Sequence, residues 1–92
     1  MDNELRKTID DAILEKTKFQ SKVDNITKDF YDHTEPVEIL KIIEIVIQNS
    51  HPGLKNTMKE FKTRYENDCL ELEDMRFYLD MYEKHKSKLK NC

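Results

Sequence analysis

Apolar residues recur at alternating intervals of four and three positions along two long stretches of the chain. The stretch over residues 3–32 carries the series Leu5, Ile9, Ala12, Lys16, Phe19, Val23, Ile26 and Phe30. The stretch over residues 52–90 carries Leu54, Met58, Phe61, Tyr65, Asp68, Leu72, Met75, Leu79, Tyr82, Lys86 and Leu89. This spacing is the a/d repeat that lets two helices pack along a continuous seam. The pattern therefore predicts two long, coiled-coil-like helices.

Two proline-containing joints lie between these stretches, "HTEP" and "NSHPG". Proline fits the first turn of a helix but disrupts its interior, so each joint separates two helices. The hydroxyl residues Thr34 and Ser50 precede the two prolines and are the expected N-caps. We therefore predict a single all-α domain, a three-helix bundle over residues 1–92 with helices over residues 3–32, 35–49 and 52–90.

Two charged residues, Lys16 and Asp68, interrupt the apolar series. In an antiparallel alignment that sets Phe30 opposite Leu54, Lys16 falls opposite Asp68. We therefore predict a long antiparallel helical hairpin in which these two residues form a buried ion pair that sets the register. The layers beyond this pair join Ala12 with Leu72, Ile9 with Met75, and Leu5 with Leu79.

The same alignment has a cost at its flanks. It brings Glu15 near Glu71 and Lys22 near Arg64, and like charges in these places repel each other. These two like-charged pairs disfavour the predicted register.

The middle stretch, "VEILKIIEIVI" over residues 37–47, is apolar on nearly every side. The ends of the long hairpin can cover only part of this surface, so the rest is expected to meet a second copy or another protein. A homodimer is the expected assembly, and a monomeric bundle with an ordinary core is the alternative. The expected partner-binding residues come from this stretch and from off-seam positions further on: Ile39, Ile42, Val46, Leu70, Phe77 and Met81.

Composition narrows the class of protein. With 92 residues, one glycine, two prolines and 38% charged residues, the chain suits a small helical domain rather than a sheet protein. The net charge of −3 provides no basic field for nucleic acid. Cys69 and Cys92 have neither the number nor the spacing of a disulfide framework, which favours a reducing compartment. No stretch approaches the length of a membrane span, so we expect a cytoplasmic or nuclear protein without membrane contact.

The sequence contains no motif for catalysis or for cofactor binding. His33 lies near Asp29, Asp32 and Glu35, but no second histidine stands at ligand spacing, so a solvated helix end is favoured over a metal site. The acidic run over residues 66–80 is expected to be a solvated helix face. We therefore expect no enzymatic activity, no cofactor, no metal and no small-molecule substrate.

The C-terminal lysines allow two interpretations. Cations at the end of a helix complement its dipole, and they also attract phosphate groups. The primary hypothesis is a non-enzymatic protein–protein interaction module, such as an adaptor, a chaperone or an inhibitor. The alternative is a small nucleic-acid-binding regulator whose phosphate contacts are Lys84, Lys86, Lys88 and Lys90.

Overall fold

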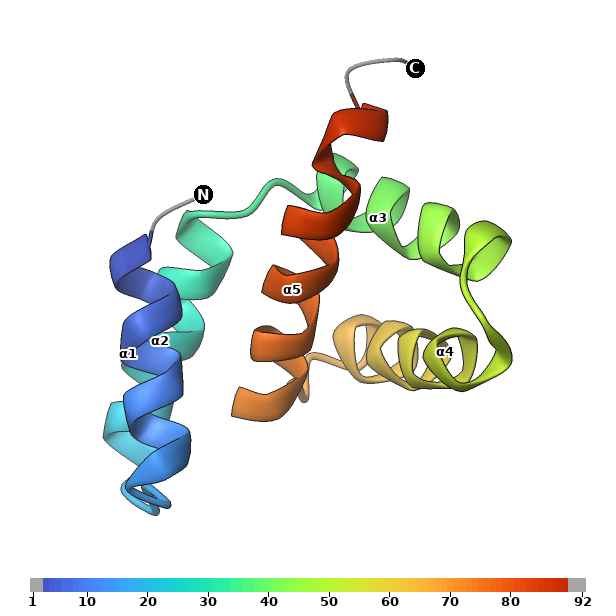
Figure 1. Ribbon diagram of the computed structural model, residues 1–92. Coiled ribbons are helices and arrows are strands. Elements are labelled where there is room, and N and C mark those ends of the chain that lie inside the picture. The colour runs from blue at the N-terminus through green and yellow to red at the C-terminus, as the bar shows by residue number, and fades with distance from the viewer. Residues whose placement is uncertain (1–2, 90–92) are drawn as a thin grey trace.

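The computed structural model describes residues 3–89 and confirms the prediction of an all-α fold. In this part of the chain there are five helices and no strand. They are α1 (Asn3–Leu14), α2 (Gln20–Asp32), α3 (Pro36–Asn49), α4 (Pro52–Glu66) and α5 (Leu72–Leu89), as shown in Figure 1.

Each of the two long helices predicted from the sequence is divided near its middle. The first break separates α1 from α2 at Lys16, and the second separates α4 from α5 at Asp68. These two residues have φ angles of 52° and 56°, in the left-handed region that ends an α-helix. The two polar residues of the apolar series therefore mark helix ends.

Both breaks have the hydrogen bonds of a Schellman motif. The residue with positive φ donates its backbone N–H to the carbonyl three residues earlier, and the next residue donates to the carbonyl five residues earlier. These bonds satisfy carbonyls that a helix end would otherwise leave without a partner. They join Lys16 to Ile13 (3.1 Å) and Thr17 to Ala12 (3.1 Å) after α1, and Asp68 to Tyr65 (3.2 Å) and Cys69 to Arg64 (2.9 Å) after α4.

The two proline joints lie where the sequence predicts them. Pro36 and Pro52 stand in the first turns of α3 and α4, but neither helix has a side-chain hydrogen bond at its N-cap. Thr34 instead donates its hydroxyl to the Phe30 carbonyl at 2.7 Å, and so closes the end of α2. The expectation that Thr34 caps α3 was therefore wrong.

Helix α5 is the centre of the bundle. It runs between the α1–α2 pair and the α3–α4 pair in Figure 1, and it contacts α1, α2 and α3. Arg6 pairs with Asp80 at 2.7 Å, and Arg76 bridges Asp10 and Asp80. Because the partner number falls as the number along α1 rises, α1 and α5 are antiparallel.

The long hairpin expected from the sequence is not the observed arrangement. The longest dimension of the molecule is 38 Å, whereas an unbroken helix over residues 52–90 would extend about 58 Å. What remains of the predicted hairpin is its outer end, where α1 lies antiparallel to α5. Its three expected layers all join the core: Leu5, Ile9, Ala12, Leu72, Met75 and Leu79.

An aromatic cluster connects α2, α4 and α5. Tyr78 is fully buried at its centre, edge-on to Phe30 with ring centroids 5.6 Å apart and stacked on Phe61 at 5.7 Å. Tyr65 joins the cluster through Phe61 and through Tyr31, at 6.2 Å from each. The cluster therefore joins the two flanks of the bundle across α5.

Candidate functional site

Lys16 and Asp68 do not lie in a buried layer. Both residues are exposed, and the ion pairs found among residues 3–89 include none between them. Asp68 accepts a hydrogen bond from the Tyr31 hydroxyl at 3.3 Å. Burial and the Asp68 charge together raise the pKa of Tyr31 to about 12. Since each residue ends a helix, neither is in a position to set the register of a continuous seam.

The structure places the six expected partner-binding residues inward. Within the single chain, Ile39, Ile42, Val46, Leu70 and Met81 are buried, and Phe77 is partly buried against the same core. Their apolar character is accounted for by the interior of one molecule. Five of the six are therefore not exposed on the surface of the single chain.

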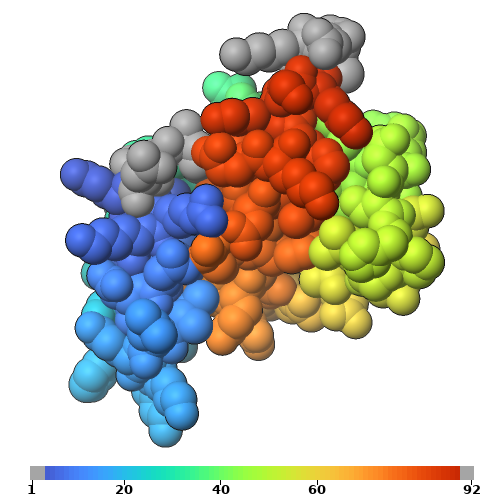
Figure 2. All heavy atoms as spheres, viewed as in Figure 1, coloured from blue at the N-terminus to red at the C-terminus, as the bar shows by residue number. Residues whose placement is uncertain are grey.

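The most exposed apolar side chains lie at the turn between α1 and α2. We call residues 14–19 the α1–α2 tip, which projects beyond the rest of the molecule at the lower left of Figure 2. Leu14 is 80% exposed and Phe19 is 76% exposed. Phe19 is the N-cap of α2 and forms no cap hydrogen bond, although a polar residue there would stabilise the helix by about 1 kcal/mol. Neither side chain contributes to the core of the single chain.

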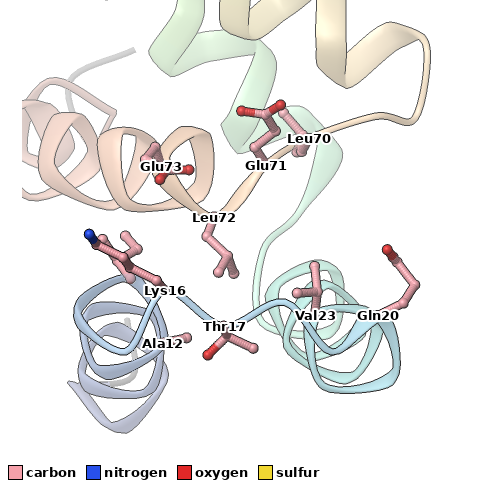
Figure 3. Close-up of a pocket in the computed structure, with 10 residues that line it drawn as sticks. Ala12, Lys16, Thr17, Gln20, Val23, Leu70, Glu71, Leu72 and Glu73 are labelled. Carbon is pink, nitrogen blue, oxygen red and sulfur yellow. The ribbon is translucent and has the colours of Figure 1, made fainter.

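A groove lies beside the tip, between the α1–α2 turn and the start of α5. This tip groove has a volume of about 470 Å³, and Leu72 points toward the turn in Figure 3. Its surface is mixed, with apolar side chains from three helices and charged side chains at its edge. The lining residues are Ala12, Ile13, Lys16, Thr17, Gln20, Val23, Leu70, Glu71, Leu72 and Glu73.

One partly buried ion pair lies next to the wall of this groove. Asp74 accepts two hydrogen bonds from the Arg64 guanidinium, both 2.7 Å, and a third from the Glu71 backbone N–H at 3.0 Å. The Asp74 hydrogen bond raises the pKa of Arg64. The sequence pattern predicts a solvated face for the acidic run that contains Asp74. Its position three residues after Glu71, at the start of α5, is the capping-box spacing that points to this structural role.

A second set of exposed apolar residues lies on α3. Val37 is 59% exposed and Leu40 is 51% exposed, and Lys41 and Glu44 are exposed on the same helix. A shallow depression of about 350 Å³ borders this face. Its lining residues are Leu40, Ile43, Glu44, Ile47, Gln48 and Lys62. The residues of α3 that the sequence predicts as partner-binding, Ile39, Ile42 and Val46, lie on its buried side.

His85 is a buried polar residue near the end of α5. It is 6% exposed, and neither ring nitrogen has a hydrogen-bond partner among the described residues. Burial lowers the pKa of His85, and the neighbouring charges of Lys88 and Lys84 lower it further. The imidazole is therefore held in its neutral form.

The structure describes three of the four C-terminal lysines that the sequence predicts as phosphate contacts. Lys84, Lys86 and Lys88 are exposed, and Lys86 pairs with Glu83 at 3.0 Å. Lys90, the fourth expected phosphate contact, and Cys92 lie outside the described residues. Cys69 is exposed and forms no disulfide.

The described residues include no group of ligands suited to a metal ion. At the end of α2, where the sequence places His33 near Asp29, the His33 Nδ1 atom lies 2.8 Å from the Asp29 carbonyl oxygen. Over residues 3–89, no helix combines the length and the apolar content needed to cross a bilayer. Comparisons with protein-family models, curated proteins and solved structures gave no match to this chain.

Proposed function

We propose that the protein is a non-enzymatic protein–protein interaction module, of the adaptor, chaperone or inhibitor type. The observation that supports this proposal is the α1–α2 tip, where Leu14 and Phe19 are 80% and 76% exposed. Aromatic and large aliphatic residues that bury no surface within their own chain are typical of interface anchors. The exposed phenyl ring at an N-cap, where it gives up a stabilising cap, supports the same interpretation.

The tip and the tip groove together fit an apolar segment of a protein partner. A side chain from the partner packs between Leu72 and Val23, while Leu14 and Phe19 pack on the partner's surface. Lys16 on one edge and Glu71 on the other give the groove charges of both signs, so the partner carries polar groups around its apolar residue. These residues replace the six that the sequence analysis named.

The expected homodimer and the cytoplasmic or nuclear location are retained as parts of the proposal. The exposed apolar residues of α3 support self-association, because a monomer gains nothing from exposing them. An exposed, unpaired Cys69 is compatible with a reducing compartment.

Affinity capture with substituted tips tests the interaction function. The wild-type chain, Leu14→Asp, Phe19→Asp and a control, Lys28→Asp, are used as baits in extracts of the cells that make the protein. Lys28 is exposed on α2, so the control adds the same carboxylate away from the tip. Partners captured by the wild type and the control should be lost with both tip variants at unchanged helicity. Identical capture by all four baits would remove the tip as the binding site.

The second candidate is the nucleic-acid-binding regulator, which the exposed Lys84, Lys86 and Lys88 support. Lysines without a recognition helix give non-specific, salt-sensitive phosphate binding. Filter binding to DNA and RNA at about 50 mM salt, with the wild type and a triple Lys→Gln variant, tests this candidate. No retention by the wild type excludes it.

A further inference from the structure

Helix α3 carries an exposed stripe of four residues that contains both apolar and charged groups. Val37, Leu40, Lys41 and Glu44 follow the spacing i, i+3, i+4 and i+7, so they lie on one face of the helix. All four are exposed, while Ile39, Ile42, Ile43 and Val46 on the opposite face are buried in the core. The α3 stripe, as we call these four residues, is therefore an outer surface that the described residues 3–89 leave uncovered.

We propose that the α3 stripe binds the α3 stripe of a second copy, with the two helices antiparallel around a twofold axis near residues 42 and 43. The inference rests on the dimer included in the proposed function and names its surface. It does not depend on the α1–α2 tip.

The charges of the stripe favour a second copy of α3 as the partner, and they favour an antiparallel pair of helices. In an antiparallel pair, Lys41 of each copy lies beside Glu44 of the other, and the symmetry forms this contact twice. A parallel, in-register pair would instead set Lys41 against Lys41 and Glu44 against Glu44. Complementary charges therefore favour the antiparallel arrangement.

The apolar residues of the stripe fit the same arrangement. The antiparallel direction carries Val37 and Leu40 of one copy toward the C-terminal half of α3 in the other. That half borders the depression between α3 and α4, where Leu40 and Ile47 provide apolar surface. Lys62 of α4 also lines this depression and lies outside the stripe. Each copy therefore provides both the inserted side chains and the surface that receives them.

The size of the contact sets the expected strength. A helix of 14 residues is about 21 Å long, so two stripes make a small contact, and small interfaces are typical of weak or transient complexes. The dimer should therefore depend on protein concentration, and its average mass should rise toward twice the chain mass as the concentration increases.

Charge reversal provides a direct test by sedimentation or light scattering. Lys41→Glu alone leaves the stripe with two acidic groups and no cation, and Glu44→Lys alone leaves it with two basic groups and no acid. Each variant should remain monomeric at concentrations where the wild type dimerises. Mixed in equal amounts they should form a heterodimer, because the two carboxylates of one chain then lie beside the two ammonium groups of the other. The double variant, Lys41→Glu with Glu44→Lys, should dimerise like the wild type.

Two further variants separate this proposal from the tip. Leu40→Asp should abolish the dimer, whereas Phe19→Asp should leave it unchanged. Lys28→Glu controls for the charge change, and circular dichroism confirms that each variant keeps its helices. A wild type that stays monomeric at every concentration, single variants that still dimerise, or a mixture that stays monomeric would each overturn the proposal. Loss of captured partners from the tip variants, with the dimer intact, would support the interaction function independently.

Discussion

Lys16 and Asp68 occupy equivalent positions at the C-terminal ends of α1 and α4, with φ angles of 52° and 56°. Each is the residue with positive φ in a Schellman motif that ends a helix. Glycine usually occupies this position. A side chain in the left-handed region costs about 1–2 kcal/mol. Both residues therefore turn the chain at some energetic cost, and both are exposed.

Replacing Lys16 with glycine should stabilise the protein. Glycine adopts the left-handed conformation without steric cost, so Lys16→Gly should raise the free energy of unfolding by about 1 kcal/mol. A control at Lys28, in the middle of α2, should show the opposite sign, because Lys28→Gly removes helix propensity worth about 1 kcal/mol. Chemical denaturation of the three proteins gives the comparison. Destabilisation by Lys16→Gly would indicate a continuous helix over residues 3–32.

Double-mutant cycles should separate the predicted pair from the observed one. Lys16→Met and Asp68→Leu should have additive effects on the free energy of unfolding, since no ion pair joins these exposed residues in the structure. Asp10→Ala and Arg76→Ala should be non-additive, because Arg76 bridges Asp10 and Asp80 across the α1–α5 contact. We expect a coupling of about 0.5–1 kcal/mol for that pair. Strong coupling between positions 16 and 68 would contradict the structure.

Asp74 should be the most sensitive charged residue. Its substitution by alanine leaves Arg64 and the Glu71 N–H without their acceptor, and should lower the free energy of unfolding by about 2–3 kcal/mol. The substitution Asp74→Asn keeps one oxygen acceptor in the side chain, so it should cost less than Asp74→Ala. The neighbouring Glu73 is exposed and serves as the control. Equal melting temperatures for Glu73→Ala and Asp74→Ala would contradict a stabilising role of the Arg64–Asp74 ion pair.

His85 should make the stability of the protein decrease in mild acid. Its pKa in the folded chain lies below the ordinary value of 6.5, so below about pH 6.5 the unfolded chain takes up a proton that the folded chain does not. The stability is therefore complete above this pH and decreases as the pH falls toward the folded pKa.

The variant His85→Leu removes this proton linkage and also two ring nitrogens that have no hydrogen-bond partner within residues 3–89. It should be more stable than the wild type by about 1 kcal/mol at pH 7.5, and the difference should grow at pH 5.5. Urea unfolding at the two pH values measures both effects. His33 and His51 are present in both proteins, so their contributions cancel in the comparison. A constant difference between the two pH values would show that His85 does not titrate as argued.

Local signals explain which parts of the fold the sequence predicts. The prolines at residues 36 and 52 mark the starts of α3 and α4, because their ring geometry suits only the first turn. The breaks after α1 and α4 lack a glycine, so no local signal separates Lys16 and Asp68 from charged residues within a helix. Only their place in an apolar series sets them apart, and that place also fits an ion pair.

The candidate binding surface is less accessible to sequence reasoning, because burial depends on which side of a helix the rest of the chain covers. On α3 nearly every position is apolar, so the pattern does not separate the core residue Ile42 from the exposed residue Leu40. Phe19 was assigned to a seam that ends three residues before it. Because the chain turns at Lys16, residues after the turn no longer continue the apolar face of α1, and Phe19 is exposed.

The aromatic cluster around Tyr78 gives the chain an intrinsic optical probe of how its helices pack together. The chain has four tyrosines and no tryptophan, and all four tyrosines take part in ring contacts that connect α2, α4 and α5. Near-ultraviolet circular dichroism and tyrosine emission therefore report on the docking of the two flanks against the central helix. Separation of the flanks, by denaturant or by a partner that enters between them, becomes visible without any added label.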